Sequence, residues 1–396
     1  MKEIYSWVPW FLELAKKIAK GDLEDFQSKA RKIVGNEKNS NEKNSNDPFS
    51  FFYFLAAKNN REKLKQAHKE YKMSRDVPTD VEVNTDRALA LQSDDHSSLW
   101  KLFEWSQRYN DKVETNKYFS EILKIRNNNI GAKTLTQCLF LINPNQFMPI
   151  DDRWYNQQEK VSLGHAIEKQ GWEYYKKALE EVKGIFPGCE FYEIYRACSI
   201  LHNSDSSSRK FFQIGIHAGG RGDDDYWLKD FDPNNWVYTG GPGDKKGWTE
   251  DAKDTAKNGF YKINRPKPGD IILVRTGAYQ GRAIGIVEDN EYAKSEKLDK
   301  ERRIHVVWIN KKEAKLIKRL GQPRGFSGVP KMLETFRETP EYLPTLEYIE
   351  SLTEESNQEK GALHSVNQKQ ETDTVKHPLN QILYGPPGTG KTWNTV

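Results

Sequence analysis

The chain has few cysteines, no long apolar run and almost no net charge. Its three cysteines, Cys138, Cys189 and Cys198, are an odd number without Cys-x-x-Cys spacing, which argues against a disulfide framework or a structural zinc site. No stretch approaches the roughly 20 apolar residues of a membrane span, and charged residues interrupt the first apolar run, which argues against a signal peptide. We therefore expect a soluble protein of a reducing, cytoplasmic compartment with no membrane partner.

The near balance of charge restricts how the chain could bind nucleic acid. Lys and Arg number 61 against 57 Asp and Glu, for a net charge of +4 in 396 residues. Any affinity for nucleic acid must therefore come from local patches. Mean hydropathy is −0.85, but aromatics reach 12% with eleven Trp. This combination favours folded domains with charged surfaces over disorder, and the length suggests roughly two to three domains.

Apolar residues recur at helical spacing through the first half of the chain. The pattern runs from Trp10 to Val34 and starts again at Phe49, after Asp47-Pro48. Three further segments show it: Ser98 to Arg108, Asn116 to Lys124 and Gly131 to Leu141. Strand-like runs are scarce before residue 205, so the spacing predicts a mostly helical domain over residues 1–204.

One segment of this half, residues 126–154, has a Gly-containing turn, a helix and paired acids after Pro-Ile. It resembles the helix-hairpin-helix segment of base-excision glycosylases. The resemblance implies contacts to a DNA phosphate by Ile130, Gly131 and Lys133, and an acidic position at Asp151 or Asp152. The turn has one Gly rather than two and no evident catalytic Lys. Three interpretations stay open: a structural domain, in which the acids cap a helix, a non-catalytic DNA contact, and a lyase or glycosylase.

After Leu201 a Ser-rich linker leads into strand patterns. Phe211 to His217 alternates, and three further runs have the pattern of strands: Asp270 to Arg275, Ala283 to Val287 and Arg303 to Ile309. A Pro-x-x-Gly turn at 266–269 precedes the second run. We expect a compact β-rich domain with flanking helices over residues 206–350.

The order of these pieces resembles the PUA-like superfamily, particularly its EVE and YTH branches. The likeness covers an opening strand, an aromatic-rich helix and loop, the Pro-x-x-Gly-Asp turn, Gly-Ile-Val and a strand ending in Val-Trp-Ile. The resemblance implies a flipped, often methylated base held in an aromatic cage, where stacking offsets the few kcal/mol of unstacking. Four aromatics would border that base: Trp227, Trp236, Tyr279 and Tyr292. Core packing is the alternative for each of them, and we assign Trp308 to the core.

A basic segment follows the last predicted strand. It has six cations against the single acid Glu313: Lys311, Lys312, Lys315, Lys318, Arg319 and Arg324. Such a segment can follow phosphates without reading bases. The alternative is a solvated helix face.

The last part of the chain has a polar linker, residues 351–377, and then a phosphate-binding loop. Within residues 378–396, three glycines let the backbone N–H groups approach phosphates: Gly385, Gly388 and Gly390. Lys391 would reach the β- and γ-phosphates and Thr392 would bind Mg²⁺, with GTP or ATP as nucleotide. Hydrolysis also needs an acidic residue on a second strand. The four residues after Thr392 cannot supply it, so we expect no turnover by this chain.

A base-reading domain, a linker and the start of an AAA+ domain resemble the N-terminal architecture of McrB-type restriction GTPases. The expected fold is therefore α+β and multidomain. The resemblance implies that the chain recognises DNA with a modified base, that an AAA+ ring assembles and hydrolyses GTP, and that a separate McrC-like subunit carries the nuclease. We find no nuclease motif in the chain. The alternatives are a PUA-like RNA reader or an adaptor that recruits a partner to an AAA+ ATPase.

Overall fold

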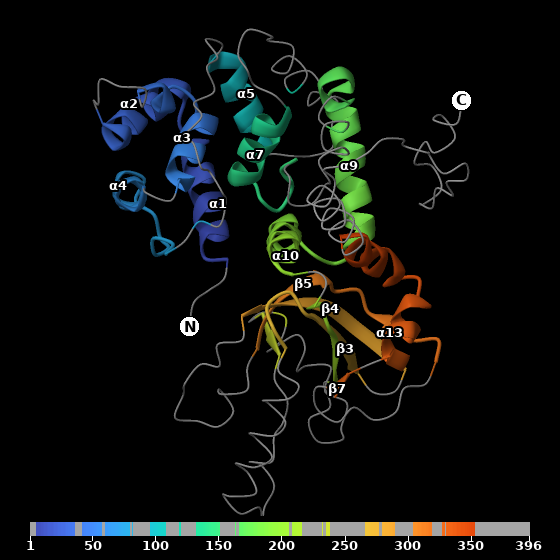
Figure 1. The fold of residues 1–396 in the computed structure, drawn as a ribbon. Coiled ribbons are helices and arrows are strands. Elements are labelled where there is room, and N and C mark those ends of the chain that lie inside the picture. The colour runs from blue at the N-terminus through green and yellow to red at the C-terminus, as the bar shows by residue number, and fades with distance from the viewer. Residues whose placement is uncertain are drawn as a thin grey trace, which may run out of the picture. The chain divides into compact units, whose positions relative to one another are not determined.

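The fold is described from a computed structural model (Figure 1). The structure describes residues 5–35, 42–57, 60–79, 81, 96–107, 119, 132–150, 163, 166–205, 208–215, 232, 235–237, 266–276, 279–289, 304–318, 327–328 and 330–352. One compact unit spans Met1–Thr353. The second unit, Glu354–Val396, contains the predicted phosphate-binding loop and lies outside the described residues.

The first part of the compact unit is helical, as predicted. Its helices are α1 (Trp7–Ile18), α2 (Leu23–Val34), α3 (Pro48–Ala56), α4 (Arg61–Glu70), α5 (His96–Gln107), α7 (Ala132–Ile142), α9 (Trp172–Ile185) and α10 (Phe191–Asn203), with a 3₁₀ turn at Glu42–Ser45. The predicted helix at Asn116 to Lys124 lies outside the described residues except for Phe119.

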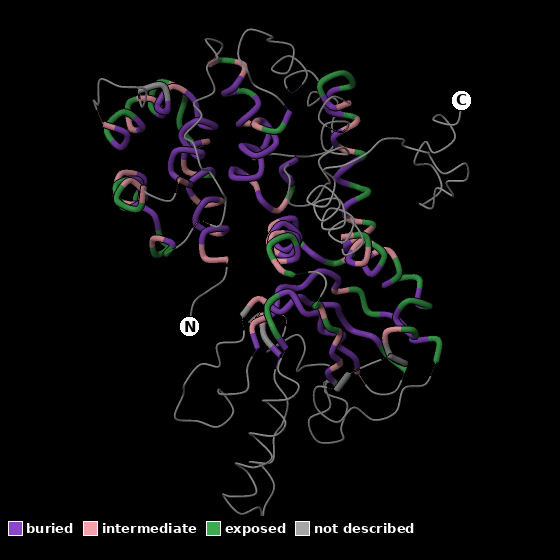
Figure 2. Tube along the Cα trace, viewed as in Figure 1, coloured by how far each residue is buried: buried purple, intermediate pink, exposed green. Residues whose placement is uncertain are grey.

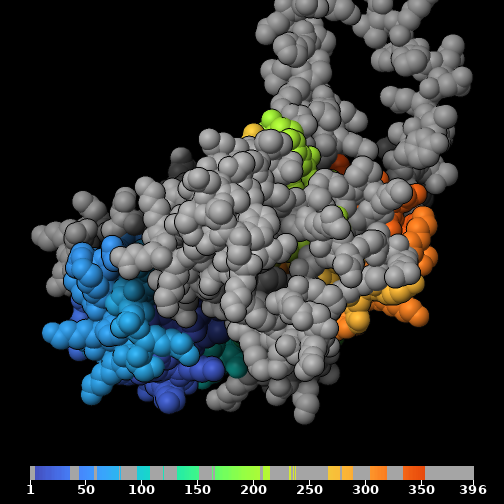
Figure 3. Space-filling view, turned by 90° about the horizontal axis from the view of Figure 1, so that it is seen from below, coloured from blue at the N-terminus to red at the C-terminus, as the bar shows by residue number. Residues whose placement is uncertain are grey.

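Helix starts and buried faces follow the sequence signals. Asp22 caps α2 by accepting from the Asp25 N–H, and Asp47 caps α3 by accepting from the Ser50 N–H. The apolar residues at helical spacing in α1 are all buried: Trp10, Phe11, Leu14, Ala15 and Ile18. Every residue of α3 is buried, and α3 contacts α4, α5 and α7, so its purple tube lies inside the helical part (Figure 2). Residues of α2 and α4, which are in contact, form one blue area of the surface in Figure 3.

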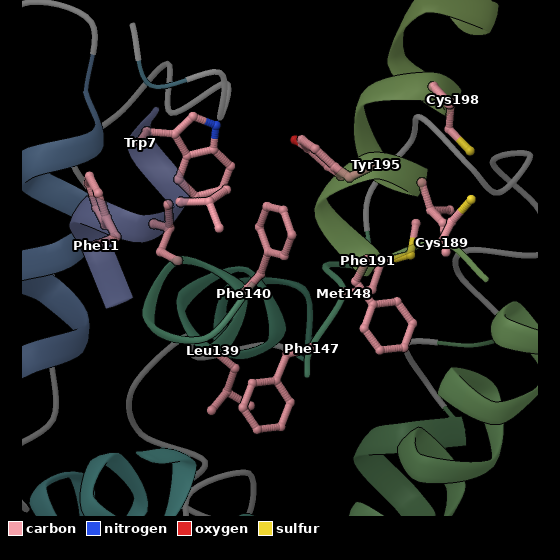
Figure 4. Close-up of a cluster of buried hydrophobic side chains, with 14 of the residues drawn as sticks. Trp7, Phe11, Leu139, Phe140, Phe147, Met148, Cys189, Phe191, Tyr195 and Cys198 are labelled. Carbon is pink, nitrogen blue, oxygen red and sulfur yellow. The ribbon is translucent and has the colours of Figure 1, made fainter. Parts of the chain in front are cut away.

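Aromatic side chains join helices that are far apart in the sequence. The Phe140 ring of α7 lies 5.8 Å from the Trp7 ring of α1 and 4.9 Å from the Tyr195 ring of α10, measured between centroids. Figure 4 shows Phe140 between these two side chains. Contacts between aromatic rings in these edge and tilted geometries contribute about 0.5–1.5 kcal/mol each beyond the area that they bury. The first and last helices of the helical part therefore share one core with α7.

The second part is a small mixed sheet of seven strands. They are β1 (Phe211–Gly215), β2 (Trp236–Val237), β3 (Ile271–Thr276), β4 (Gln280–Asp289), β5 (Ile304–Asn310), β6 (Ala314–Lys315) and β7 (Ser327–Gly328). The order is β2-β5-β4-β3-β1-β7, with β6 paired to β4. Only β1 and β3 run parallel among these pairs. Helix α13 (Pro330–Arg337) and a helix at 343–352 follow.

The predicted turn at 266–269 leads into Asp270, which joins the starts of β1 and β3. Asp270 accepts hydrogen bonds from the backbone N–H of Lys210 at 2.8 Å and of Lys267 at 2.6 Å. Gly269 has a φ of +89°, a conformation that favours glycine, and its N–H donates to the Val287 carbonyl. Trp308 has no exposed surface. The four predicted strands and the assignment of Trp308 to the core are therefore confirmed.

Helix α10 connects the helical part to the sheet. It contacts β5 and β4, and Arg196 forms an ion pair with Glu288 of β4. Just before α10, the Cys189 thiol lies 3.5 Å from the Trp308 carbonyl, to which it can donate. The predicted boundary at residues 204–206 therefore falls within one compact unit.

Candidate nucleic-acid interface

Six of the residues predicted to contact nucleic acid have described side chains: Tyr279, Lys133, Lys311, Lys312, Lys315 and Lys318. Trp236 is placed by its backbone in β2. Outside the described residues lie Ile130, Gly131, Asp151, Asp152, Trp227, Tyr292, Arg319, Arg324, Gly385, Gly388, Gly390, Lys391 and Thr392. Lys133 is exposed on α7, and its predicted phosphate contact stays a prediction.

Strand β6 brings the backbone of a predicted base-binding aromatic close to that of a predicted phosphate-binding cation. In the antiparallel pairing of β4 with β6, Gln280 lies opposite Lys315. The next step of the ladder is a hydrogen bond from the Leu316 N–H to the Tyr279 carbonyl at 2.6 Å. Tyr279 is 50% exposed and Lys315 is exposed. Side chains at successive ladder steps point to opposite faces of a sheet, so Tyr279 and Lys315 lie on the two sides of this sheet edge. We call the exposed residues on and beside β6 the β6 surface: Tyr279, Lys312, Lys315 and Ile317.

The acid within this basic segment is neutralised by a neighbouring strand. Arg282 of β4, whose side chain is nearly buried, forms an ion pair with Glu313. The Gln280 amide also donates to the Glu313 carboxylate. By contrast, no ion pair joins Lys312 or Lys315 to another residue that the structure describes. Among the residues that the structure places, the β6 surface thus presents two cations without an ion pair.

Lys318 is exposed but already has acidic neighbours. Its ammonium lies 2.6 Å from Glu338 and 3.7 Å from Glu334 of α13. The hydrogen bond to Glu338, together with the charge of Glu334, raises the pKa of Lys318. A phosphate would have to compete with both carboxylates for this cation. We therefore expect Lys318 to contribute less to binding than Lys312 or Lys315.

The position of Lys311 corrects its predicted role. Its side chain is 17% exposed, and its ammonium lies 3.0 Å from Glu193 and 3.3 Å from Asp232. A cation held in this way is not available to a phosphate. The helix-face alternative is also wrong for residues 311–318, because this segment includes the strand β6 and no helix.

A tyrosine that the sequence analysis did not identify supports the β6 surface from the inside. The Tyr342 hydroxyl donates to the Lys312 carbonyl at 2.7 Å, and its ring stacks on Phe336 at 4.5 Å between centroids. A Cβ at Gly281 would lie 2.6 Å from the Tyr342 ring, so the strand approaches the ring closely because residue 281 is glycine. The partners of Tyr342 and Arg282 are distant in the sequence, which therefore has no local signal for either residue.

The three cysteines of the described region are buried, and no disulfide bond joins them. Burial raises the pKa of the Cys138 and Cys189 thiols well above the ordinary value, so they are poor nucleophiles at neutral pH. Over the residues that the structure places, no group of three or more His, Cys, Asp or Glu could hold a metal ion.

Comparison with known proteins gives one similarity. Residues 7–200 match a family described as Domain of unknown function (DUF8425). This region is just under half of the chain, covers the helical part and ends within α10. No curated protein and no solved structure matches the chain.

Proposed function

We propose that the chain is the DNA-recognition part of a McrB-type, nucleotide-dependent restriction system, and that it binds DNA carrying a modified, flipped base. The observation that carries this proposal is the β6 surface, where half-exposed Tyr279 and exposed Lys315 lie one ladder step apart in the β4–β6 pair. An aromatic face can stack on a base while cations contact the phosphates beside it. The two groups that such binding requires thus lie at neighbouring ladder steps of one sheet edge, on its two sides.

The other parts of the proposal rest on the sequence. Residues 206–350 would form the PUA-like domain, in which Trp236, Trp227 and Tyr292 border the base together with Tyr279. Residues 385–392 would bind GTP or ATP with Mg²⁺, Thr392 being the metal ligand. The AAA+ part would assemble into a ring, and cleavage would belong to a separate McrC-like nuclease.

The geometry also limits how strongly phosphates contribute to binding. Each neutralised phosphate of B-DNA changes the slope of log K against log salt by about −0.9. Lys312 and Lys315 are the cations without an ion pair in the described part of the basic segment, so this part accounts for a slope of about −1.8. Discrimination between bases must come from the aromatic side chains.

The test measures binding of the full chain to matched duplexes, with and without a modified base, over a salt series. Lys315→Gln should weaken binding to both duplexes alike and reduce the steepness of the salt dependence by about 0.9. Tyr279→Ala should leave the slope unchanged and weaken binding to the modified duplex by about 1–3 kcal/mol, the contribution of one stacked base. Trp236→Ala should act in the same way as Tyr279→Ala.

Equal affinity of the wild-type chain for the two duplexes, unaltered by either aromatic substitution, would refute base recognition. An unchanged salt slope in the Lys315 variant would refute its phosphate contact. Lys133→Gln is a further comparison, because its contact is predicted from the hairpin resemblance alone. Release of free base from damaged duplexes would instead support chemistry at Asp151 or Asp152.

A second candidate function is favoured by the apolar part of the same surface. Ile317 is 60% exposed and follows the Leu316 N–H that bonds Tyr279. An exposed aliphatic side chain suits a protein partner, as in an adaptor for an AAA+ ATPase. Ile317→Ser should then abolish partner binding without altering DNA affinity. The RNA-reader alternative is distinguished from DNA recognition by competition between matched RNA and DNA probes for the chain. An RNA reader should prefer the RNA probe, because it would depend on unpaired bases and 2′-hydroxyls.

A further inference from the structure

Lys311 lies where three separate stretches of the chain meet. It directly follows β5, and its backbone N–H donates to the Pro187 carbonyl at 2.9 Å. Its ammonium lies 3.0 Å from Glu193 of α10 and 3.3 Å from Asp232. Burial opposes the charge of Lys311, but the two carboxylates outweigh it and raise its pKa. Lys311 is therefore a charged bridge between α10 and the Asp232 segment.

The α10 side of this bridge is fixed. Gly188 has a φ of +80°, and a Cβ there would lie 3.2 Å from the Lys311 Cβ, so the two backbones approach closely. Glu193 is 4% exposed and forms a capping box with Glu190 at the start of the helix. Glu193 thus has little freedom to move, and it holds the Lys311 ammonium in one place.

The Asp232 side leads directly into β2. The Asn235 N–H donates to the Asp232 carbonyl at 3.3 Å, and the Asn235 carbonyl accepts from the Val306 N–H at 2.8 Å. Asn235 has a φ of +52°, the left-handed conformation that Asn tolerates better than most residues. The next residue, Trp236, pairs with His305 of β5. The Asp232 turn therefore sets where Trp236 enters the sheet.

We propose that Lys311 is a positioning residue, which ties the Asp232 turn to α10 and so fixes the backbone of the base-reading residue Trp236. Among the described residues, Lys311 is the ion-pair partner of Asp232. One cation serves two carboxylates here, so its loss would leave Glu193 and Asp232 repelling each other and release the turn. The link to base reading rests on the proposed function, whereas the anchoring of the turn does not.

The structural test uses Asp232→Asn in the full chain, because Lys311 keeps its buried partner Glu193 and the protein should fold. Amide hydrogen exchange at Val306, whose N–H bonds Asn235, should rise about fivefold, the effect of losing one ion pair. Lys311→Met should raise the Val306 exchange rate at least as much. The double variant, with both Asp232→Asn and Lys311→Met, should exchange at nearly the same rate as Lys311→Met alone. Lys312→Met is the matched control, and exchange at Val306 should not change in it.

The binding test uses the same variants with the modified and unmodified duplexes. Asp232→Asn and Lys311→Met should lower the ratio of the two affinities about fivefold and leave the salt slope unchanged. Lys312→Met should keep the ratio and make the slope shallower. Loss of Lys311 should thus change the affinity ratio alone, and loss of Lys312 should change the salt slope alone. A shallower salt slope in Lys311→Met would overturn the proposal.

Unchanged exchange at Val306 in both Asp232→Asn and Lys311→Met would also overturn it. Faster exchange in these variants, with a wild-type chain that binds both duplexes equally, would support the anchoring and refute the proposed function instead.

Discussion

Asp47 is a carboxylate without exposed surface at the start of α3. Burial raises its pKa to about 6, although the Ser50 N–H and hydroxyl both donate to it. The folded state therefore binds a proton more readily than the unfolded state between about pH 4 and 6. The stability that this proton contributes is present below about pH 4 and is lost as the pH rises through about 6.

Asp47→Asn keeps an oxygen that can cap α3 but has no charge to bury. We expect the wild-type chain to lose about 3 kcal/mol between about pH 4 and 7 from this residue, and the Asp47→Asn variant to lack that dependence. Asp47→Ala should be destabilised by about 1 kcal/mol relative to Asp47→Asn at every pH, because it removes the cap. Urea unfolding at several pH values measures both effects, and identical pH profiles for the wild type and the Asp47→Asn variant would contradict this assignment.

At the scale of single residues, the sequence predicts type and position but not partners. Lys311 and Lys312 are adjacent and chemically alike, so the sequence predicts the same role for both. The structure separates them because Glu193 and Asp232, the partners of Lys311, are distant in the sequence. Trp308 is predicted correctly because its burial follows from alternation along β5, which is a local signal.

Helix α4 ends with a left-handed residue that is not glycine. Lys72 has a φ of +48°, and the hydrogen bond from the Met73 N–H to the His68 carbonyl closes the terminus. This is the Schellman arrangement, which usually has Gly at the left-handed position. The Lys17 ammonium donates to the Lys72 carbonyl, which adds support from α1.

Lys72→Gly should therefore stabilise the protein by about 0.5–1 kcal/mol, because glycine adopts this conformation without steric cost. Lys69→Gly, three residues earlier in the exposed last turn of α4, is the matched control. There the same substitution should destabilise by up to about 1 kcal/mol. Equilibrium unfolding measures the change in the free energy of unfolding for each variant. If both substitutions destabilise the protein, the Lys72 side chain itself stabilises the native state.

At the scale of elements, the helices and strands with strong apolar patterns are the most predictable. The predicted strands correspond to β1, β3, β4 and β5 within a few residues. Helix α9 is not among the predicted helices, although its buried residues follow helical spacing: Trp172, Tyr175, Leu179 and Val182. Strand β6 has only two residues, which is too short for an alternating pattern, so its pairing with β4 could not be predicted.

The whole molecule is predictable only in outline. A helical first part and a mixed sheet are confirmed, but their shared core is not a feature of local sequence. It arises from contacts such as Arg196 with Glu288 and the Thr345 hydroxyl with the Ile185 carbonyl. Among the described helices, none is long and apolar enough to cross a membrane.

The shared core predicts how the compact unit unfolds. Residues 1–353 should unfold in a single transition, with helix content and tryptophan fluorescence changing together. A chain of residues 206–353 lacks α10 and should expose the face of β4 and β5 that α10 contacts, so it should bind a hydrophobic dye. A chain of residues 186–353 restores α10 and should bind less. Two separate transitions for residues 1–353 would contradict a common core.

Helix α10 also constrains how such a protein could diversify. The similarity to the domain family stops at residue 200, yet Glu193 and Arg196 before that point hold Lys311 and Glu288 beyond it. The helical part could be joined to a different sheet domain only if the new domain supplied a cation for Glu193 and an acid for Arg196. A chimera joined directly after α10 should therefore fold when its new domain carries equivalents of both Lys311 and Glu288. A chimera with the same junction but without these two charges should not fold.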